Sequence, residues 1–226
     1  LEETIRLAVR EGGDTPLAIL DSASREKVAA AYPDLPLHPR RNYFEYVYRA
    51  SDLAELRGRR YLNIRRQLNR FRRRCTYAVD AMGPDDLADV REFLLEWCDW
   101  RDCESHPILA HEKEAILRTL DHFQELGIEG RTIRVDGRVA SMALFEPLNE
   151  TTAVVHFEKG LPDCEGIYKA MNAETARVLA ERFPFINRES DLGNAGLRES
   201  KMRYHPHHMV EVYVAQREDL ARLLPG

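Results

Sequence analysis

The sequence has no long apolar run and no leader pattern. None of its apolar stretches reaches the roughly 18–20 residues that a membrane-spanning helix needs, and no signal peptide opens the chain. We therefore expect no transmembrane segment and a cytoplasmic location, either free or peripheral to the membrane. Because the chain begins with Leu1, we also expect it to be a fragment or a trimmed protein.

Cysteine and metal-ligand patterns are also sparse. The four cysteines, Cys75, Cys98, Cys103 and Cys164, have the spacing of neither a zinc site nor a dense disulfide framework. We expect them to be free thiols, as in cytosolic proteins. The His205–His208 stretch, with three histidines, lacks a nearby carboxylate pair at a standard spacing. We therefore expect no metal site, and no cofactor is certain.

Composition and length indicate a globular protein with unevenly placed charge. The chain has 226 residues, of which 44% are hydrophobic and 31% charged, enough for one large domain or two small ones. The net charge of −5 excludes a polyanion-binding role for the molecule as a whole. Residues 57–74, however, hold nine arginines and no acid.

The second half of the chain has clear secondary-structure signals. Gly83-Pro84 predicts a helix start, and Gly127 and Pro184 predict helix ends. Asp136-Gly137 is a strong two-residue hairpin signal. Periodicity predicts strands at 76–79, 128–135, 138–146, 151–157, 185–187 and 209–215, and helices at 83–100, 110–126, 166–182 and 197–203.

This order, β-α-α-β-β-β-α-β-α-β, is the element order of the GNAT acyltransferase fold. It predicts an α+β protein with a mixed α/β sheet, in which an antiparallel meander is followed by a β-α-β crossover. We expect residues 76–226 to form one complete GNAT-like domain.

The first half repeats the end of this pattern. We expect a helix over residues 2–10 that Gly12-Gly13 ends, and a strand at 17–20. A helix capped by Ser22 or Ser24 and a strand at 42–48 follow. This α-β-α-β series predicts a tandem arrangement, in which residues 1–56 are a partial first GNAT-like unit that lacks its earlier part.

A basic connector, residues 57–75, joins the two predicted units. Its apolar residues recur at spacings of three and four, so one stripe of an amphipathic helix can pack on the protein. The arginines cover the other faces. One interpretation is a solvated helix paired with the chain's acids. The other is a surface for tRNA phosphates or anionic lipid headgroups. The candidate polyanion-binding residues are Arg59, Arg65, Arg66, Arg70 and Arg73.

The end of the predicted strand 151–157 carries the first candidate site. Acyl transfer needs a nucleophile, a group that takes its proton, and positive charge where the oxyanion forms. Strand alternation places His156 and Glu158 on one face and Lys159 on the other. Glu158 is our candidate base or amine-binding carboxylate, and the alternative is an ion pair at a strand end. His156 is a candidate substrate-binding residue or a core histidine.

The segment around residues 191–198 carries the second candidate site. Arg198 and Lys201 lie three residues apart on a predicted helix, where they are suited to stabilise an oxyanion or bind a phosphate or carboxylate. Asp191 is a third catalytic candidate, and it is equally suited to cap the helix or to pair with Arg198. Asn187 and Tyr204 complete this group as candidate substrate-binding residues. Tyr204 is also suited to donate a proton, and the alternative is a buried tyrosine in the sheet edge.

The loop 160–166 bears on the acyl donor. GNAT enzymes that use acetyl-CoA hold its pyrophosphate on a glycine-rich loop and a helix N-terminus. Here only Gly166 matches, and Asp163 and Glu165 stand where an anion would bind. This argues against coenzyme A. Tyr168 and Asn172, four apart on the next helix, either line the cleft or pack and cap.

Three stretches resemble one family. They are FEYVYRASDLAELRGRRYLNIRRQLNRF at 44–71, VVHFEKGLPDCEGIYKAMN at 154–172 and INRESDLGNAGLRESKMRYHP at 186–206. Together they resemble the phosphatidylglycerol lysyltransferase C-terminal-like family of tandem GNAT folds. The resemblance implies aminoacyl transfer from aminoacyl-tRNA to an amine or hydroxyl, on a lipid or another acceptor. It also implies that the N-terminal part of the first unit and any membrane-embedded flippase domain are absent from this chain.

Two other functions fit the same residues. An acyl-CoA-dependent N-acyltransferase would use acetyl-CoA as donor. A non-catalytic GNAT-derived module would bind nucleic acid or anionic membrane through the arginines, and it would tolerate replacement of Glu158, Arg198 and Lys201.

Overall fold

The computed structural model describes residues 3, 6–7, 10 and 17–223. The chain forms two compact units: unit 1 is Leu1–Val47 with Glu189–Gly226, and unit 2 is Tyr48–Arg188. These units do not coincide with the predicted limits 1–56, 57–75 and 76–226, so the tandem arrangement stays a prediction. The helix end predicted at Gly12-Gly13 lies outside the described residues.

Unit 2 is built on a mixed sheet. Its strands lie in the order β4-β5-β6-β7-β8, and only the β7–β8 pair is parallel. The predicted meander followed by a β-α-β crossover is thus confirmed. At the β5–β6 hairpin, Asp136 and Gly137 both have positive φ, 49° and 85°, as a type I′ turn requires. The strands are β4 (Tyr77–Ala81), β5 (Glu129–Val135), β6 (Arg138–Asn149), β7 (Thr152–Gly160) and β8 (Phe185–Asn187).

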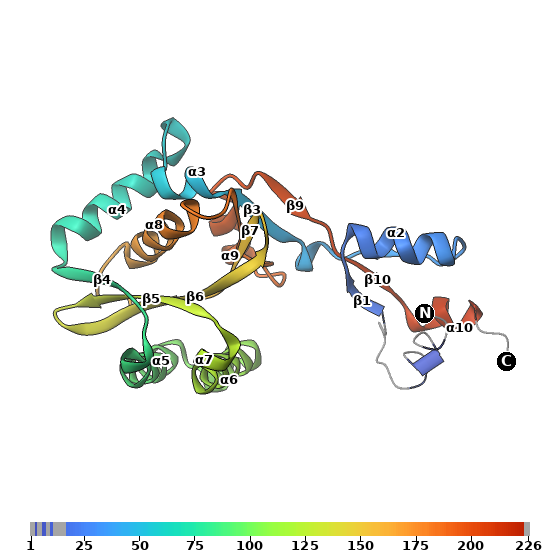
Figure 1. The fold of residues 1–226 in the computed structure, drawn as a ribbon, viewed down its shortest axis with the longest axis horizontal. Helices are drawn as coiled ribbons and strands as arrows, with labels where there is room; N and C mark the ends of the chain where they lie inside the picture. Colours follow the sequence, from blue (N-terminus) through green and yellow to red (C-terminus); the bar gives the residue numbers. More distant parts are fainter. Residues whose placement is uncertain (1–2, 4–5, 8–9, 11–16, 224–226) are drawn as a thin grey trace. The chain divides into compact units, whose positions relative to one another are not determined.

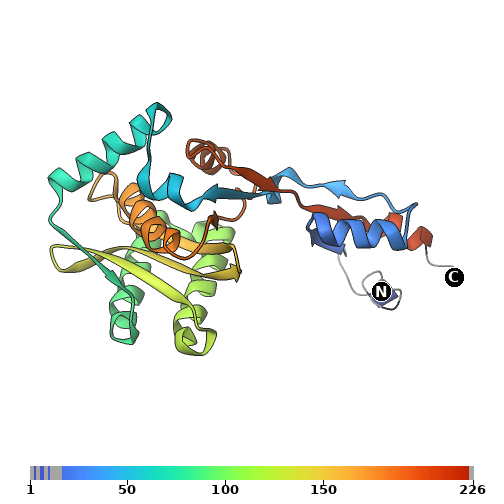
Figure 2. The same ribbon diagram turned by 45° about the horizontal axis from the view of Figure 1, so that its top comes forward.

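Helices cover both faces of this sheet (Figures 1 and 2). On one face lie α5 (Leu87–Arg101), α6 (Pro107–Asp121) and α7 (Phe123–Leu126). The other face is covered by α8 (Ile167–Ala180), on which α3 (Ala50–Glu55) and α4 (Leu62–Arg74) pack. The helix predicted at 110–126 is thus two helices, and Gly127 ends the second with φ 64°.

One hydrophobic core of unit 2 fills the space between β6 and helices α5 to α7. Apolar residues of α5 recur every three or four positions and are buried there against the sheet. Its largest members are Phe93, Leu94, Trp97, Ile116, Leu120, Phe123, Met142 and Leu144.

Unit 1 holds one three-stranded sheet and one further antiparallel strand pair. In the three-stranded sheet, β1 (Leu17–Leu20) and β2 (His38–Pro39) flank β10 (Tyr213–Ala215). The pair is β9 (His208–Val210) with β3 (Glu45–Arg49). The single strand predicted at 209–215 is therefore wrong, because the chain changes sheets at Val212, whose carbonyl accepts the Arg40 N–H.

The helices of unit 1 are α2 (Ser22–Ala31), α9 (Ala195–Met202) and α10 (Arg217–Leu223). The predicted serine cap of α2 is wrong. Asp21 caps this helix, and its carboxylate accepts the Ser24 N–H at 2.8 Å. An aspartate at this position gives a stronger cap because its charge also opposes the helix dipole.

The four cysteines are not free thiols, contrary to the sequence-based expectation. Cys75 is bonded to Cys164, and Cys98 to Cys103. Cys75 follows the last residue of α4 and Cys164 lies in the loop before α8, so packing of α4 on α8 brings together residues 89 apart. This spacing carries no signal in the sequence, which explains the error.

Two glycine-to-alanine substitutions test how closely the loop before α8 packs on α4, one at Gly166 in this loop and one at Gly137 in the β5–β6 turn. Gly166 has φ +96°, and an added Cβ would lie 2.6 Å from the Gln67 carbonyl oxygen. Gly137 has φ +85° but open space around it. We expect Gly137→Ala to cost about 1–2 kcal/mol of unfolding free energy from backbone strain alone. Gly166→Ala should cost about 1–3 kcal/mol more, because the methyl group overpacks the site. Urea unfolding measures both, and equal costs would contradict this packing.

Candidate acyl-transfer site

The parallel pairing of β7 with β8 is short and leaves the end of β7 open on one side. It joins only Thr152–Val154 to Phe185–Asn187. Beyond Val154, β7 continues to Gly160 with β6 as its neighbour. Open α/β sheets bind ligands beyond the carboxyl ends of their parallel strands. Here this place is occupied by side chains from the end of β7, the residue after β8, and α8.

Glu158, Arg188 and Asn172 meet at this place. Arg188 Nη2 lies 3.2 Å from each Glu158 carboxylate oxygen, and both side chains are nearly buried. Asn172 Nδ2 lies 3.5 Å from Glu158 Oε2. With its amide turned over, its oxygen accepts from Arg188 Nη1 and Nε at 3.1 and 3.2 Å. The structure thus holds a charged, hydrogen-bonded carboxylate where the two strands part.

Lys159 points to the opposite face, as alternation predicted. Its Nζ lies 2.5 Å from Glu112 of α6 and 4.3 Å from the centre of the Trp97 ring. Burial lowers the pKa of Lys159, and Glu112 opposes this shift. The Trp97 indole N–H donates to the Tyr168 hydroxyl at 3.1 Å. Burial raises the pKa of Tyr168, so it stays protonated at neutral pH. Tyr168 thus joins a tightly packed cluster on the α5 and α6 side.

His156 and Asn187 lie on β7 and β8, the two strands beside the Glu158 site. His156 Nε2 lies 2.9 Å from Glu146 Oε1 on β6. Asn187 is buried at the last position of β8. Their substrate-binding roles remain predictions.

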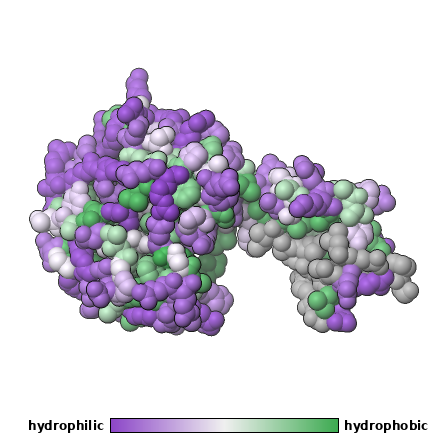
Figure 3. Space-filling model, in the orientation of Figure 1, coloured by the Kyte–Doolittle hydropathy of each residue, from purple (hydrophilic) through white to green (hydrophobic). Residues whose placement is uncertain are grey.

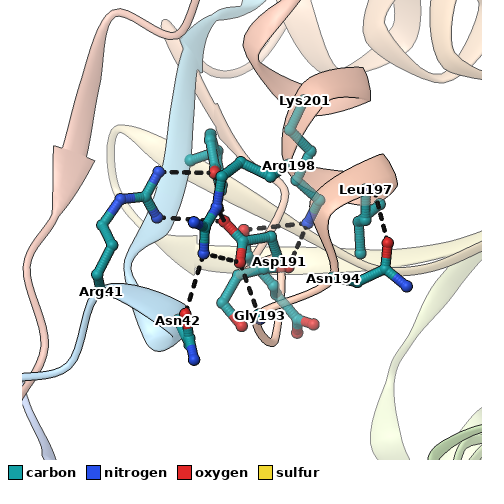
Figure 4. A network of polar contacts seen from close by, with 11 residues as sticks. Arg41, Asn42, Asp191, Gly193, Asn194, Leu197, Arg198 and Lys201 are labelled. Atoms are coloured by element: carbon teal, nitrogen blue, oxygen red, sulfur yellow. Dashed lines mark hydrogen bonds and ion pairs between the residues drawn. The ribbon is translucent and has the colours of Figure 1, made fainter.

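Unit 1 holds the second group of candidates, centred on Asp191 (Figure 4). The Asp191 carboxylate is fully buried and accepts two hydrogen bonds of 2.9 Å from Arg198, one from Nε and one from Nη2. Arg41 donates to it at 3.2 Å and the Tyr46 hydroxyl at 2.5 Å. The Gly193 N–H donates at 2.9 Å. Asp191 is thus a partner of Arg198, one of the alternatives that the sequence left open.

The polar side chains on and beside α9 also have partners within unit 1 or are buried there. The helix cap of α9 is Asn194, whose side chain accepts the Leu197 N–H at 2.9 Å. Lys201 is nearly buried, and its ammonium donates to the carbonyls of Glu189 and Ser190 at 3.1 and 2.7 Å. Tyr204 is buried after α9. In this structure Arg198 and Lys201 hold the 189–193 segment, and their oxyanion role stays a prediction.

Burial and hydrogen bonding act in opposite directions on Asp191. Burial raises its pKa, but the hydrogen bonds from Arg198, Tyr46 and Gly193 lower it more, so the pKa lies well below its usual range. Asp191 is therefore ionised at neutral pH and in moderate acid. A permanently ionised, fully bonded carboxylate is suited to orient cations and not to exchange protons.

The sequence missed several of these partners. Arg188 directly follows β8, and a polar residue at the carboxyl end of a parallel strand was a usable signal. Arg41 and Tyr46 lie 150 and 145 residues from Asp191, and no local pattern connects them.

The arginines of the basic connector form a hollow along α4. Its apolar stripe is buried, as predicted, through Ile64, Leu68 and Phe71. Arg66, Asn69, Arg70, Arg73 and Arg74 line a hollow of about 440 Å³ on the outward face. In Figure 3, hydrophilic side chains cover the upper left of the molecule, where α4 lies.

The nine arginines are only partly paired. Five have carboxylate partners: Arg57, Arg60, Arg70, Arg72 and Arg74. Arg65 donates to the carbonyls of Leu56 and Gly58, and Arg73 to that of Asn69. Arg59 and Arg66 have no ion-pair partner within the described residues. The helix is therefore neither fully paired with acids nor fully free.

Two further observations concern only the part of the chain that the structure describes. Within residues 3, 6–7, 10 and 17–223, no three side chains of His, Cys, Asp or Glu are arranged to hold a metal ion. Over the same residues, no helix is both long and apolar enough to span a membrane.

The Asp191 network predicts a pH-dependent stability. We expect Asp191→Asn to lower the unfolding free energy by about 3–5 kcal/mol at pH 7, because it leaves Arg198 and Arg41 without their buried counter-charge. Since the folded-state pKa is depressed, this contribution is complete above the unfolded pKa of about 3.9 and is lost as pH falls below it. Urea unfolding of both proteins at pH 7 and near pH 3 should show the gap shrinking.

The matched control for this prediction lies on the same helix. Glu199 forms an exposed ion pair with Arg203, so Glu199→Gln should cost less than about 0.5 kcal/mol. A comparable loss in both variants would show that the Asp191 network contributes no more than a surface pair.

Comparison with known proteins agrees with this fold. Among curated proteins, none matches the chain. A conserved protein of unknown function from Bacteroides thetaiotaomicron VPI-5482 is similar, with 30% identity and a TM-score of 0.87, over 95% of this chain and 73% of that one.

Two more solved structures share the fold at lower identity. One is the C-terminal domain of a putative lysylphosphatidylglycerol synthetase from Agrobacterium fabrum (14% identity, TM-score 0.68, 98% of this chain and 74% of that one). The other is L-PGS from Bacillus licheniformis (15% identity, TM-score 0.61, 86% and 70%). The model of the family "Phosphatidylglycerol lysyltransferase, C-terminal" matches residues 1–216. The chain, with its α+β GNAT fold and mixed sheet, therefore belongs to the phosphatidylglycerol lysyltransferase C-terminal family.

Proposed function

We propose that this chain transfers an aminoacyl group from aminoacyl-tRNA to an amine or hydroxyl acceptor, a lipid headgroup or another molecule. The family and the fold support the coarser statement that it is a GNAT-like acyltransferase. The observation that carries the finer proposal is the arginine-lined hollow on α4. Arginine binds phosphate through two parallel hydrogen bonds, and a row of such residues fits a nucleic-acid backbone.

The loop after β7 favours this donor over coenzyme A. Asp163 and Glu165 lie in the loop before α8, and both are exposed. Their charges repel a pyrophosphate at the start of α8. Gly166, the residue before α8, packs against the Gln67 carbonyl, so its backbone is already in contact with α4. The donor phosphates are better matched by α4 than by this loop.

In the proposed reaction the acceptor's nitrogen or oxygen attacks the aminoacyl ester carbonyl, and the tRNA 3′-oxygen leaves. Glu158 receives the proton of the nucleophile or binds its ammonium group. Arg188 orients the carboxylate directly, and the Asn172 amide oxygen holds Arg188 in place. This assigns Glu158 a catalytic role and makes Arg188 and Asn172 positioning residues.

Replacing Glu158 tests the catalytic role. We expect Glu158→Gln to lower kcat/KM for transfer from charged tRNA by about 10²–10⁴-fold, the range for loss of a general base. The control is Glu129→Gln, which removes an exposed carboxylate paired with Arg182 and should leave activity unchanged. An active Glu158→Gln enzyme would refute the assignment. Turnover with acetyl-CoA and none with charged tRNA would favour an N-acyltransferase, and no turnover with either would favour a binding module.

Salt dependence tests the donor-binding surface. We expect tRNA to bind with an affinity that falls steeply with salt, and the double variant Arg66→Ser, Arg73→Ser to flatten the slope of log K against log salt by about 1.5, or about 0.7–0.9 per lost phosphate contact. The control Arg118→Ser removes an exposed arginine of α6 and should leave the slope unchanged. Equal slopes in all three proteins would exclude α4 as the tRNA surface.

A further inference from the structure

The loop before α8 is attached to α4 by three separate contacts. The Cys75–Cys164 disulfide joins the residue that follows α4 to the loop. Gly166 approaches the Gln67 carbonyl so closely that a Cβ would lie 2.6 Å away. Glu165 pairs with Arg70 and, at 3.8 Å, with Arg74. Together these contacts hold the loop against the helix.

Glu165 therefore contacts arginines that line the hollow. Arg70 and Arg74 are two of the four arginines that line it. A carboxylate of the protein itself thus contacts the same guanidinium groups that a phosphate would bind. Both side chains of the Arg70–Glu165 pair are about half exposed, and exposed pairs of this kind are weak enough to exchange.

We propose that Glu165 is a built-in competitor of phosphate ligands at this hollow, and that the Cys75–Cys164 disulfide holds it there. Reduction removes one of the three contacts that hold the loop, weakens the contact of Glu165 with the arginines, and so strengthens polyanion binding. This inference rests on the polyanion surface assigned above to α4, and it adds redox control to that surface.

The redox step needs a dithiol reductant. One thiolate of the reductant attacks a sulfur of the disulfide and forms a mixed disulfide. The second thiolate displaces the protein sulfur and closes a cyclic disulfide. Two electrons and two protons pass to Cys75 and Cys164, which become thiols. Both cysteines are half-buried and not fully enclosed, so a small reductant has access.

Glu165→Gln tests the competition directly. Titration calorimetry with inorganic tripolyphosphate measures the hollow without any RNA. We expect Glu165→Gln to bind about two- to fivefold more tightly than wild type, the effect of removing one exposed ion pair. The matched control is Glu174→Gln, which removes a carboxylate from Arg72, an arginine outside the hollow, and should leave affinity unchanged. Equal affinity of Glu165→Gln and wild type would overturn the proposal.

The effect of reduction on tripolyphosphate binding is measured in the double variant Cys98→Ser, Cys103→Ser. In this variant only the Cys75–Cys164 disulfide can be reduced. Dithiothreitol should raise its tripolyphosphate affinity by a similar two- to fivefold. Adding Glu165→Gln should abolish this response, because the competitor is already gone. A response that persists without Glu165, or no response at all, would overturn the proposal. A circular dichroism spectrum before and after reduction checks that the fold is intact.

The two proposals fail in different ways. If tripolyphosphate binds as expected but charged tRNA gives no transfer, the aminoacyl-transfer function is wrong and the competition stands. If transfer occurs but neither Glu165→Gln nor reduction changes tripolyphosphate binding, the function stands and the redox control is wrong.

Discussion

Much of unit 2 depends on where the pairing of β7 with β8 stops. Only three residues of each strand pair, and β7 then runs on to Gly160 beside β6. The unpaired edge gives space for a buried carboxylate, and Glu158 fills it with Arg188 and Asn172 around it. The same divergence sends the chain through the 161–166 loop and into α8. The position of the loop on α4 follows from this geometry.

Unit 1 depends on the burial of one charge. Taking the Asp191 carboxylate out of water is costly unless it is compensated. Arg198, Arg41, Tyr46 and the Gly193 N–H supply that compensation, each from a different place in the chain. The result ties the 189–193 segment to α9, to Arg41 before β3 and to Tyr46 within β3. Two of the four charged residues nominated from the sequence for catalysis, Asp191 and Arg198, are therefore engaged with each other.

The arginine helix α4 has one face fixed by apolar burial and one face that concentrates charge. Its apolar stripe is buried, because Ile64, Leu68 and Phe71 recur at helical spacing. Its outward face concentrates positive charge in a protein whose net charge is −5. A nearby loop with two acids partly neutralises that charge through Glu165. We have proposed that this contact sets the affinity of the helix for phosphate.

The features that the sequence alone determined depend on neighbouring residues or on the regular spacing of residue types. The Asp136-Gly137 turn, the limits of β8, the buried stripe of α4 and the opposite orientations of Glu158 and Lys159 follow from backbone preference and residue spacing. The tertiary structure decided what distant residues do to each other: the Cys75–Cys164 bond, the Arg41 and Tyr46 contacts to Asp191, and the break at Val212 between β9 and β10. These depend on packing between segments far apart in the chain, and a local pattern carries no record of such distances.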